Sequence, residues 1–225
     1  MERKCLFIDD DPDDVKSVLE NLTYKGKLKG LDINCQLLGL TRAFYQDNGD
    51  LDRNKIETAL HSQFMDNHTY DLVACDFGLE DEKLTGLDMV TLVRLKSRNC
   101  AIVLYSGNLE KIANYIAERE TLKDRYRKIR SIVNGRITEF IDRGKDYEEQ
   151  LIHIMMEKIP IEVTIEKKLQ EHGDFKFKHG YEKFIGKSLK EIAREIKIGS
   201  PHGNTFKNEI IERGIAHMIE LNSRE

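Results

Sequence analysis

Short apolar runs alternate with longer amphipathic stretches along the first two thirds of the chain. Each run is rich in Val, Ile, Leu, Ala or Cys and ends at polar residues, which predicts a strand buried on both faces of a sheet. The runs are residues 5–8, 33–40, 72–75, 101–105 and 137–141. Strands that alternate with helices favour a parallel sheet with right-handed crossovers. We therefore predict an α/β domain with a doubly wound, five-stranded parallel sheet.

The stretches between these runs carry apolar residues at helical spacing. Helices are predicted to begin near Pro12, Gly86 and Asp146, because the apolar positions that follow recur every three to four residues. Residues 41–69 combine a turn with one helical face, and residues 109–133 predict one long, highly charged helix. Both segments are longer than a simple crossover between parallel strands requires.

Polar residues stand directly after four of the predicted strands. They are Asp9 and Asp10 after the first strand, Asp76 after the third, Ser106 after the fourth, and Arg143 and Lys145 after the fifth. Because the carboxyl ends of parallel strands meet at one edge, where open α/β folds bind ligands, we expect one site there. The alternative is a solvated acidic helix start, since Asp13 and Asp14 suit the positive end of the helix from Pro12.

The expected site combines carboxylates with a hydroxyl and a cation. Carboxylates so close together are costly unless a cation neutralises them, and oxygen ligands of this kind suit Mg²⁺. The Ser106 hydroxyl and a cation after the fifth strand would hold the other oxygens of a phosphoryl group on Asp76. These residues therefore favour magnesium-dependent phosphoryl chemistry.

Composition narrows the class of protein. The chain has 225 residues, of which 40% are hydrophobic and 34% charged, which fits a globular rather than a disordered chain. Its formal charge of −4 predicts no strong non-specific attraction to nucleic acid. The four cysteines show no C-x-x-C spacing and are expected to be buried, reduced thiols. No apolar stretch suits a signal peptide or a membrane span, so a cytoplasmic location without membrane contact is expected.

Four motifs in order make a family resemblance. The segments I-D-D-D-P, L-V-A-C-D-F-G-L with T-G-L-D-M, V-L-Y-S-G and E-F-I-D-R together resemble the receiver domain of two-component response regulators. The resemblance covers residues 3–157 and implies a CheY-like, flavodoxin-type fold. By position it implies an acidic pair, a phospho-acceptor, a backbone metal ligand, a switch hydroxyl and a rotating aromatic. In that order they are Asp9 with Asp10, Asp76, the carbonyl of Gly78, Ser106 and Phe140. The implied cofactor is Mg²⁺, held by Asp9 or Asp10 together with Asp76 and Gly78.

The chain departs from the family pattern in two ways. The family has Lys after the fifth strand, where this chain has Arg143, with Lys145 two residues later and Gly144 in place of the usual proline. Arginine keeps the charge but not the compact ammonium geometry. The segments 41–69 and 109–133 are also enlarged. The second lies where the family's signalling surface forms, so it would remodel that surface, bind a partner, or be a surface insertion without a role.

Residues 158–225 predict a small, mainly helical module after the domain of residues 1–157. A capping box starts a helix at Ser188, and a loop over 197–204 precedes a second helix from Thr205. This arrangement weakly resembles a helix-turn-helix output module, whose output helix would present Thr205, Lys207 and Asn208. DNA binding, a protein contact and a homodimer through this module all stay open. The aromatic and lysine residues over 175–190 fit either nucleic acid or the two faces of a small domain.

The resemblance implies a response regulator that accepts a phosphoryl group on Asp76 from a histidine kinase or a phosphotransfer protein. Such a protein is a phospho-acceptor rather than an enzyme, apart from slow autodephosphorylation. One alternative is a degenerate receiver that acts as a non-phosphorylated interaction scaffold. Another is a Mg²⁺-dependent phosphohydrolase of the haloacid-dehalogenase type, which is disfavoured because Gly78 stands where such enzymes have a second Asp.

Overall fold

The structure is a computed structural model that describes residues 2–79, 81, 83–117, 121–144 and 146–223. By its internal contacts the chain divides into two units. The first comprises residues 1–96 and 100–159, and the second comprises residues 97–99 and 160–225.

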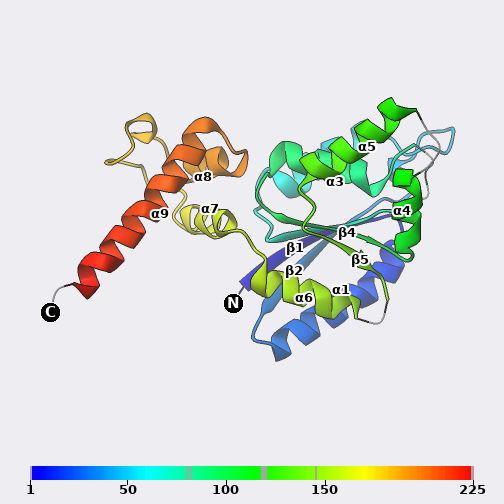
Figure 1. The fold of residues 1–225 in the computed structure, drawn as a ribbon, viewed down its shortest axis with the longest axis horizontal. Coiled ribbons are helices and arrows are strands. Elements are labelled where there is room, and N and C mark those ends of the chain that lie inside the picture. Colours follow the sequence, from blue (N-terminus) through cyan, green and yellow to red (C-terminus); the bar gives the residue numbers. More distant parts are fainter. Residues whose placement is uncertain (1, 80, 82, 118–120, 145, 224–225) are drawn as a thin grey trace. The chain divides into compact units, whose positions relative to one another are not determined.

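The first unit is built on a parallel sheet of five strands (Figure 1). In chain order they are β1 (Glu2–Asp9), β2 (Asp32–Gly39), β3 (Leu72–Asp76), β4 (Ala101–Ser106) and β5 (Glu139–Asp142). Their order in the sheet is β2-β1-β3-β4-β5, which is the flavodoxin-like form of the doubly wound fold. The predicted fold class is therefore confirmed.

Helices cover both faces of this sheet (Figure 1). The helices α1 (Pro12–Leu28) and α6 (Tyr147–Glu157) lie on one face. On the other face lie α3 (Gly86–Lys96), α5 (Leu122–Gly135) and α2 (Arg53–Ala59). Both faces of every central strand are consequently covered, which is why these strands read as continuous apolar runs in the sequence.

Alternate side chains of each strand enter two separate cores. In β1, Leu6 and Ile8 pack on the side of α3, whereas Cys5 and Phe7 pack on the side of α1 and α6. All four side chains are at most 1% exposed. Because burying one such large apolar side chain contributes about 1.5–3 kcal/mol, the two cores hold the strand ends in a fixed relation.

The two enlarged segments, residues 41–69 and 109–133, each contain more than one helical element. The prediction of one long helix over 109–133 is wrong, since the chain forms α4 (Leu109–Ala117) and a separate α5. The Thr121 side chain accepts a hydrogen bond from the backbone N–H of Asp124 and so starts α5 anew. Residues 41–69 form a 3₁₀ turn η1 (Arg42–Phe44), α2 and a π-helical turn η2 (Leu60–Met65).

The second unit packs four helical segments around a small aromatic and aliphatic core. They are α7 (Ile161–Glu171), the 3₁₀ turn η3 (Glu182–Phe184), α8 (Leu189–Lys197) and α9 (Pro201–Asn222). Its buried centre consists of Phe184, Ile192, Ile196 and Phe206. The capping box that was predicted at Ser188 is present, with Glu191 as its partner.

The predicted start of the last helix at Thr205 is wrong. Ser200 accepts a hydrogen bond from the N–H of Gly203 (2.9 Å), and Pro201 occupies the first turn, so α9 begins four residues earlier. Lys207, one of the expected output residues, forms an ion pair with Glu162 (3.0 Å).

The other two expected output residues lie on the outer side of α9. The hydroxyl of Thr205 donates to the carbonyl of Pro201 (3.0 Å), and Asn208 is exposed. A helix-turn-helix function of this module stays a prediction. Across the described ranges, no helix combines the length and the apolar character needed to cross a bilayer.

Glu166 is a buried acid inside the second unit. It is 1% exposed, and its Oε1 accepts a hydrogen bond from the side chain of Asn99 (2.7 Å). Its Oε2 has no hydrogen-bond partner within the described residues. Burial raises the pKa of Glu166 to about 7, against the opposing effects of the Asn99 hydrogen bond and the Lys197 charge. Ionised Glu166 therefore destabilises this unit at neutral and higher pH.

Replacing Glu166 by Gln is expected to stabilise the protein above pH 7 by up to about 3 kcal/mol, because the folded pKa of about 7 exceeds the unfolded value of 4.5. The stabilisation should shrink as the pH falls through this interval and vanish below it, where Glu166 is protonated in both states. Urea unfolding of Glu166→Gln and wild type between pH 4 and 8 measures this. The control is Glu171→Gln, at an exposed position of α7. A pH-independent difference for Glu166→Gln would contradict the assignment.

Candidate metal and phosphoryl site

Three carboxylates converge at the carboxyl edge of the sheet. One ligand oxygen from each of Asp9, Asp10 and Asp76 lies within 4.8 Å of the other two. The convergence follows from the strand order, because β1 and β3 are neighbours with Ile8 paired to Cys75. Asp9 and Asp76 come one residue after this pair, so the sequence-predicted acids do come together.

The chain after β1 turns tightly to present Asp10. The backbone N–H of Asp11 donates to Oδ1 of Asp9 (2.7 Å), and the Asp11 carboxylate accepts from the N–H of Asp14 (3.1 Å) at the start of α1. This capping arrangement fixes the two residues on either side of Asp10. Asp10 itself is half-buried beside the other two acids.

The chain after Asp76 needs a glycine to pass the site. A Cβ atom on Gly86, the first residue of α3, would lie 2.2 Å from the carbonyl oxygen of Asp76. Only glycine therefore lets α3 begin against the end of β3. Between them, the N–H of Gly78 donates to Oδ1 of Asp76 (3.1 Å), which fixes one oxygen of the carboxylate.

The electrostatics of Asp76 are those of a crowded, half-buried acid. Burial raises its pKa to about 6, the Gly78 N–H lowers it, and the charges of Asp9 and Asp10 raise it further. The pKa lies below 7, so the carboxylate is mostly ionised at neutral pH. A bound divalent cation would relieve the repulsion among the three acids.

Asp9 is the most buried member of the cluster. It is 0% exposed, and burial raises its pKa, opposed by a hydrogen bond from the Tyr105 hydroxyl. That hydroxyl donates to Oδ2 of Asp9 over 2.5 Å. Sequence reasoning missed Tyr105, although a tyrosine inside an otherwise apolar buried strand needs a partner for its hydroxyl.

Arg143 lies beside the acidic cluster and forms ion pairs with Asp9 of the cluster and with Asp14 in the first turn of α1. Its Nη2 is 3.3 Å from Oδ2 of Asp14 and 3.4 Å from Oδ2 of Asp9. Its backbone N–H donates to the carbonyl of Ser106 (2.9 Å), which places the residue next to the end of β4. The guanidinium thus lies on the Asp9 side of the cluster. Lys145, the other expected cation, lies outside the described residues.

The two expected switch residues occupy different surroundings. Ser106 is buried at the end of β4, and its hydroxyl interacts with both the carbonyl and the N–H of Asn108 (3.2 Å each). Phe140, on β5, has an exposed fraction of 37%. The described contacts of Ser106 therefore go to the loop after β4 rather than to Asp76.

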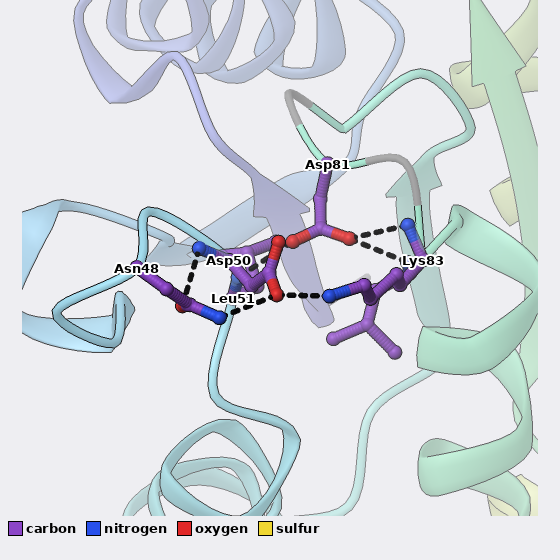
Figure 2. A network of polar contacts seen from close by, with 6 residues as sticks. Asn48, Asp50, Leu51, Asp81 and Lys83 are labelled. Carbon is purple, nitrogen blue, oxygen red and sulfur yellow. Dashed lines mark hydrogen bonds and ion pairs between the residues drawn. The ribbon is translucent and has the colours of Figure 1, made fainter.

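A polar network anchors the loop that follows Asp76 (Figure 2). The Asp81 carboxylate accepts hydrogen bonds from the N–H groups of Lys83 (2.6 Å) and Leu84 (2.7 Å) in its own loop, and from Leu51 (2.6 Å) in the enlarged 41–69 segment. Lys83 pairs with Asp50 of that segment. The enlarged segment therefore fixes the loop between β3 and α3.

The donor set of this edge fits Mg²⁺. All three side chains offer carboxylate oxygens, and Mg²⁺ binds through one or two carboxylates with water and phosphate oxygens completing its shell. Asp9 or Asp10, together with Asp76, would hold such an ion, with the Gly78 carbonyl as the expected backbone ligand. When bound, the ion would neutralise charge on the carboxylates and on an incoming phosphoryl group.

These features define the class of the first unit: a flavodoxin-type α/β domain with an acidic site where its strands end. No protein-family model matches the chain, and no curated protein matches it significantly.

Several solved structures resemble this chain over most of their own length. The response regulator protein TrrA from Thermotoga maritima, in complex with Mg²⁺-BeF, is 18% identical, with 68% of this chain and 97% of TrrA covered and a TM-score of 0.38. The receiver domain of Francisella response regulator 1452 is 16% identical, with 69% and 98% covered and a TM-score of 0.36. An adenylate cyclase from Rhodopirellula baltica is 14% identical, with 76% and 98% covered and a TM-score of 0.43. At these scores the likeness adds nothing to what the strand order and the site already show.

Mg²⁺ is expected to stabilise the wild-type protein by about 1–3 kcal/mol near saturation, because it binds the folded cluster and not the unfolded chain. Asp10→Asn should stabilise the metal-free protein, by relieving repulsion, and lose most of the gain from Mg²⁺. Thermal unfolding over a MgCl₂ titration measures both effects. The control is Asp13→Asn, at an exposed acid outside the cluster that pairs with Lys16. An equal Mg²⁺ response in Asp10→Asn and wild type would contradict the site.

Proposed function

We propose that this chain is a receiver of a two-component phosphorelay, which accepts a phosphoryl group on Asp76 from a histidine kinase or a phosphotransfer protein. The observation that carries the proposal is the acidic cluster, in which three carboxylates meet within 4.8 Å at the carboxyl edge of a flavodoxin-type sheet. The order of the receiver-like motifs along the sequence supports it independently.

In the proposed reaction, Asp76 attacks phosphorus through Oδ2. Its Oδ1 is held by the Gly78 N–H, which orients the carboxylate. A bond forms between Oδ2 and phosphorus, and the bond from phosphorus to the donor nitrogen or oxygen breaks. The leaving group takes its proton from solvent. Because the pKa of Asp76 is about 6, the carboxylate is in its nucleophilic form at neutral pH.

Arg143 is proposed to supply the positive charge opposite the acids. Its guanidinium pairs with Asp9 and Asp14 before transfer. It would turn toward the new phosphoryl oxygens, which its planar donors suit. Ser106 would exchange its contacts with Asn108 for a phosphoryl oxygen, and Phe140 would move with it.

The output is proposed to pass through the face that α4, α5 and β5 form and through the C-terminal module. Within that face, α5 presents an apolar stripe to solvent at successive turns of the helix. The stripe consists of Leu122, Tyr126, Ile129 and Val133, with exposed fractions of 84%, 67%, 51% and 66%. A stripe of this kind is typical of a partner surface, which favours a protein contact as the output.

A second candidate function is a receiver that never carries phosphate and acts as an interaction scaffold. The ion pairs that Arg143 forms with Asp9 and Asp14 favour it, because they tie the expected phosphate-binding cation to other acids. A DNA-binding output has less support, since Lys207 of the expected output helix is engaged by Glu162. Phosphorylation in vitro separates receiver from scaffold.

Incubation with a small phosphodonor and Mg²⁺ is expected to add one phosphoryl group to the wild-type chain, read by intact-mass spectrometry. Asp76→Asn should stay unmodified, because an amide is not a nucleophile at phosphorus, and Asp13→Asn should be modified like wild type. Hydroxylamine should remove the group, as expected of an acyl phosphate. Equal lack of modification in wild type and Asp76→Asn would contradict the proposal and favour the scaffold.

Arg143→Ala is expected to slow phosphorylation by at least about tenfold, which corresponds to ~1.4 kcal/mol of lost transition-state stabilisation. Arg143→Lys should retain most of the rate, because the family's usual cation is lysine. Single-turnover labelling at fixed donor concentration gives the rates, and thermal unfolding identifies any general loss of structure. An unchanged labelling rate in Arg143→Ala would remove Arg143 from the reaction.

A further inference from the structure

Tyr105 reaches across the sheet to the acidic cluster. It belongs to β4, and Asp9 belongs to β1, with β3 between them. Two strand spacings amount to about 9.5 Å. A tyrosine side chain is long enough to bring its hydroxyl across this distance to an aspartate, whereas serine and threonine side chains are too short. The two residues share a face of the sheet, since Tyr105 and Phe7, two positions before Asp9, lie in the same core.

The position of the Tyr105 hydroxyl is fixed by its surroundings. Its side chain is 0% exposed, and its ring contacts those of Phe7 and Tyr147, with centroids 6.4 Å and 5.3 Å away. A tyrosine hydroxyl is protonated at neutral pH, so it can donate. A rigid donor is therefore aimed at Oδ2 of Asp9, at 2.5 Å.

Asp9 is consequently held at both of its oxygens. Oδ1 accepts from the N–H of Asp11 (2.7 Å), and Oδ2 accepts from Tyr105 and lies 3.4 Å from Arg143. These bonds fix the plane of a buried carboxylate that stands within 4.8 Å of its two neighbours. Asp9 is therefore the acid of the cluster whose position is set by Tyr105 from β4 and by the backbone N–H of Asp11.

We propose that Tyr105 is a positioning residue of this site: through its hydroxyl it holds Asp9 in the position in which the three converging acids can bind a divalent cation. This inference rests on the proposed function and goes beyond it, because it assigns a role to a residue outside the acidic cluster. Groups that orient the ligands of a metal commonly contribute tenfold to a hundredfold in affinity.

The chain offers a matched control in Tyr147. This residue is also buried in the same core, its ring lies against that of Tyr105, and its hydroxyl has no hydrogen-bond partner among the described residues. Tyr105→Phe and Tyr147→Phe each remove one buried oxygen and keep the ring. Only the first is expected to change cation binding.

The test is a calorimetric titration of the unphosphorylated full chain with MgCl₂, at a temperature well below the unfolding transition of every variant. Tyr105→Phe is expected to weaken Mg²⁺ binding at least about tenfold, and Tyr147→Phe to leave it within about twofold of wild type. In an Asp9→Asn background the Tyr105→Phe loss should disappear, because both changes act through the same carboxylate.

Three results would overturn the inference: equal affinity in Tyr105→Phe and wild type, equal losses in the two Tyr→Phe variants, or a Tyr105→Phe loss that persists in Asp9→Asn. In each of these, phosphorylation of wild type on Asp76 can still succeed, so the proposed function is judged separately. If wild type binds no Mg²⁺ at all, the proposed function and this inference fail together.

Discussion

Mutual repulsion among three carboxylates is the interaction on which the organisation of this domain depends. Asp9, Asp10 and Asp76 meet because two neighbouring strands end at the same edge of the sheet. Burial makes the repulsion stronger, since water screens it less. A fold that concentrates charge in this way has less stability without a cation than with one.

Backbone and side-chain groups around the cluster hold its carboxylates in place. Backbone N–H groups of Asp11 and Gly78 each fix one oxygen of an acid. Tyr105 and Arg143 approach Asp9 from β4 and from the end of β5. Gly86 lets α3 start against β3, and Asp81 fastens the intervening loop to the enlarged 41–69 segment. The pocket thus depends on backbone geometry as much as on the acids themselves.

Much of this could be predicted from the sequence. The five short apolar runs predicted the strands, because a strand covered on both faces must be apolar throughout. The polar residues after these runs predicted where the acids meet, because parallel strands end at one edge of the sheet. The partner of Tyr105 could not be predicted, since it depends on β3 lying between β1 and β4. The partners of Arg143 depend on side-chain packing at the start of α1. Single capping residues decide where two helices begin: Thr121 starts α5 and Ser200 starts α9. A single capping residue is a weaker signal in the sequence than the periodic spacing of apolar residues.

A crystal structure of the full chain grown with Mg²⁺ and beryllofluoride tests the central claim most directly, because this complex imitates an aspartyl phosphate. We expect the fluoride group on Asp76, the ion between Asp10 and Asp76, and Arg143 or Ser106 turned toward the fluorides. An Asp76 without the fluoride group, with Arg143 still paired to Asp9 and Asp14, would contradict a phosphoryl-accepting role for this cluster.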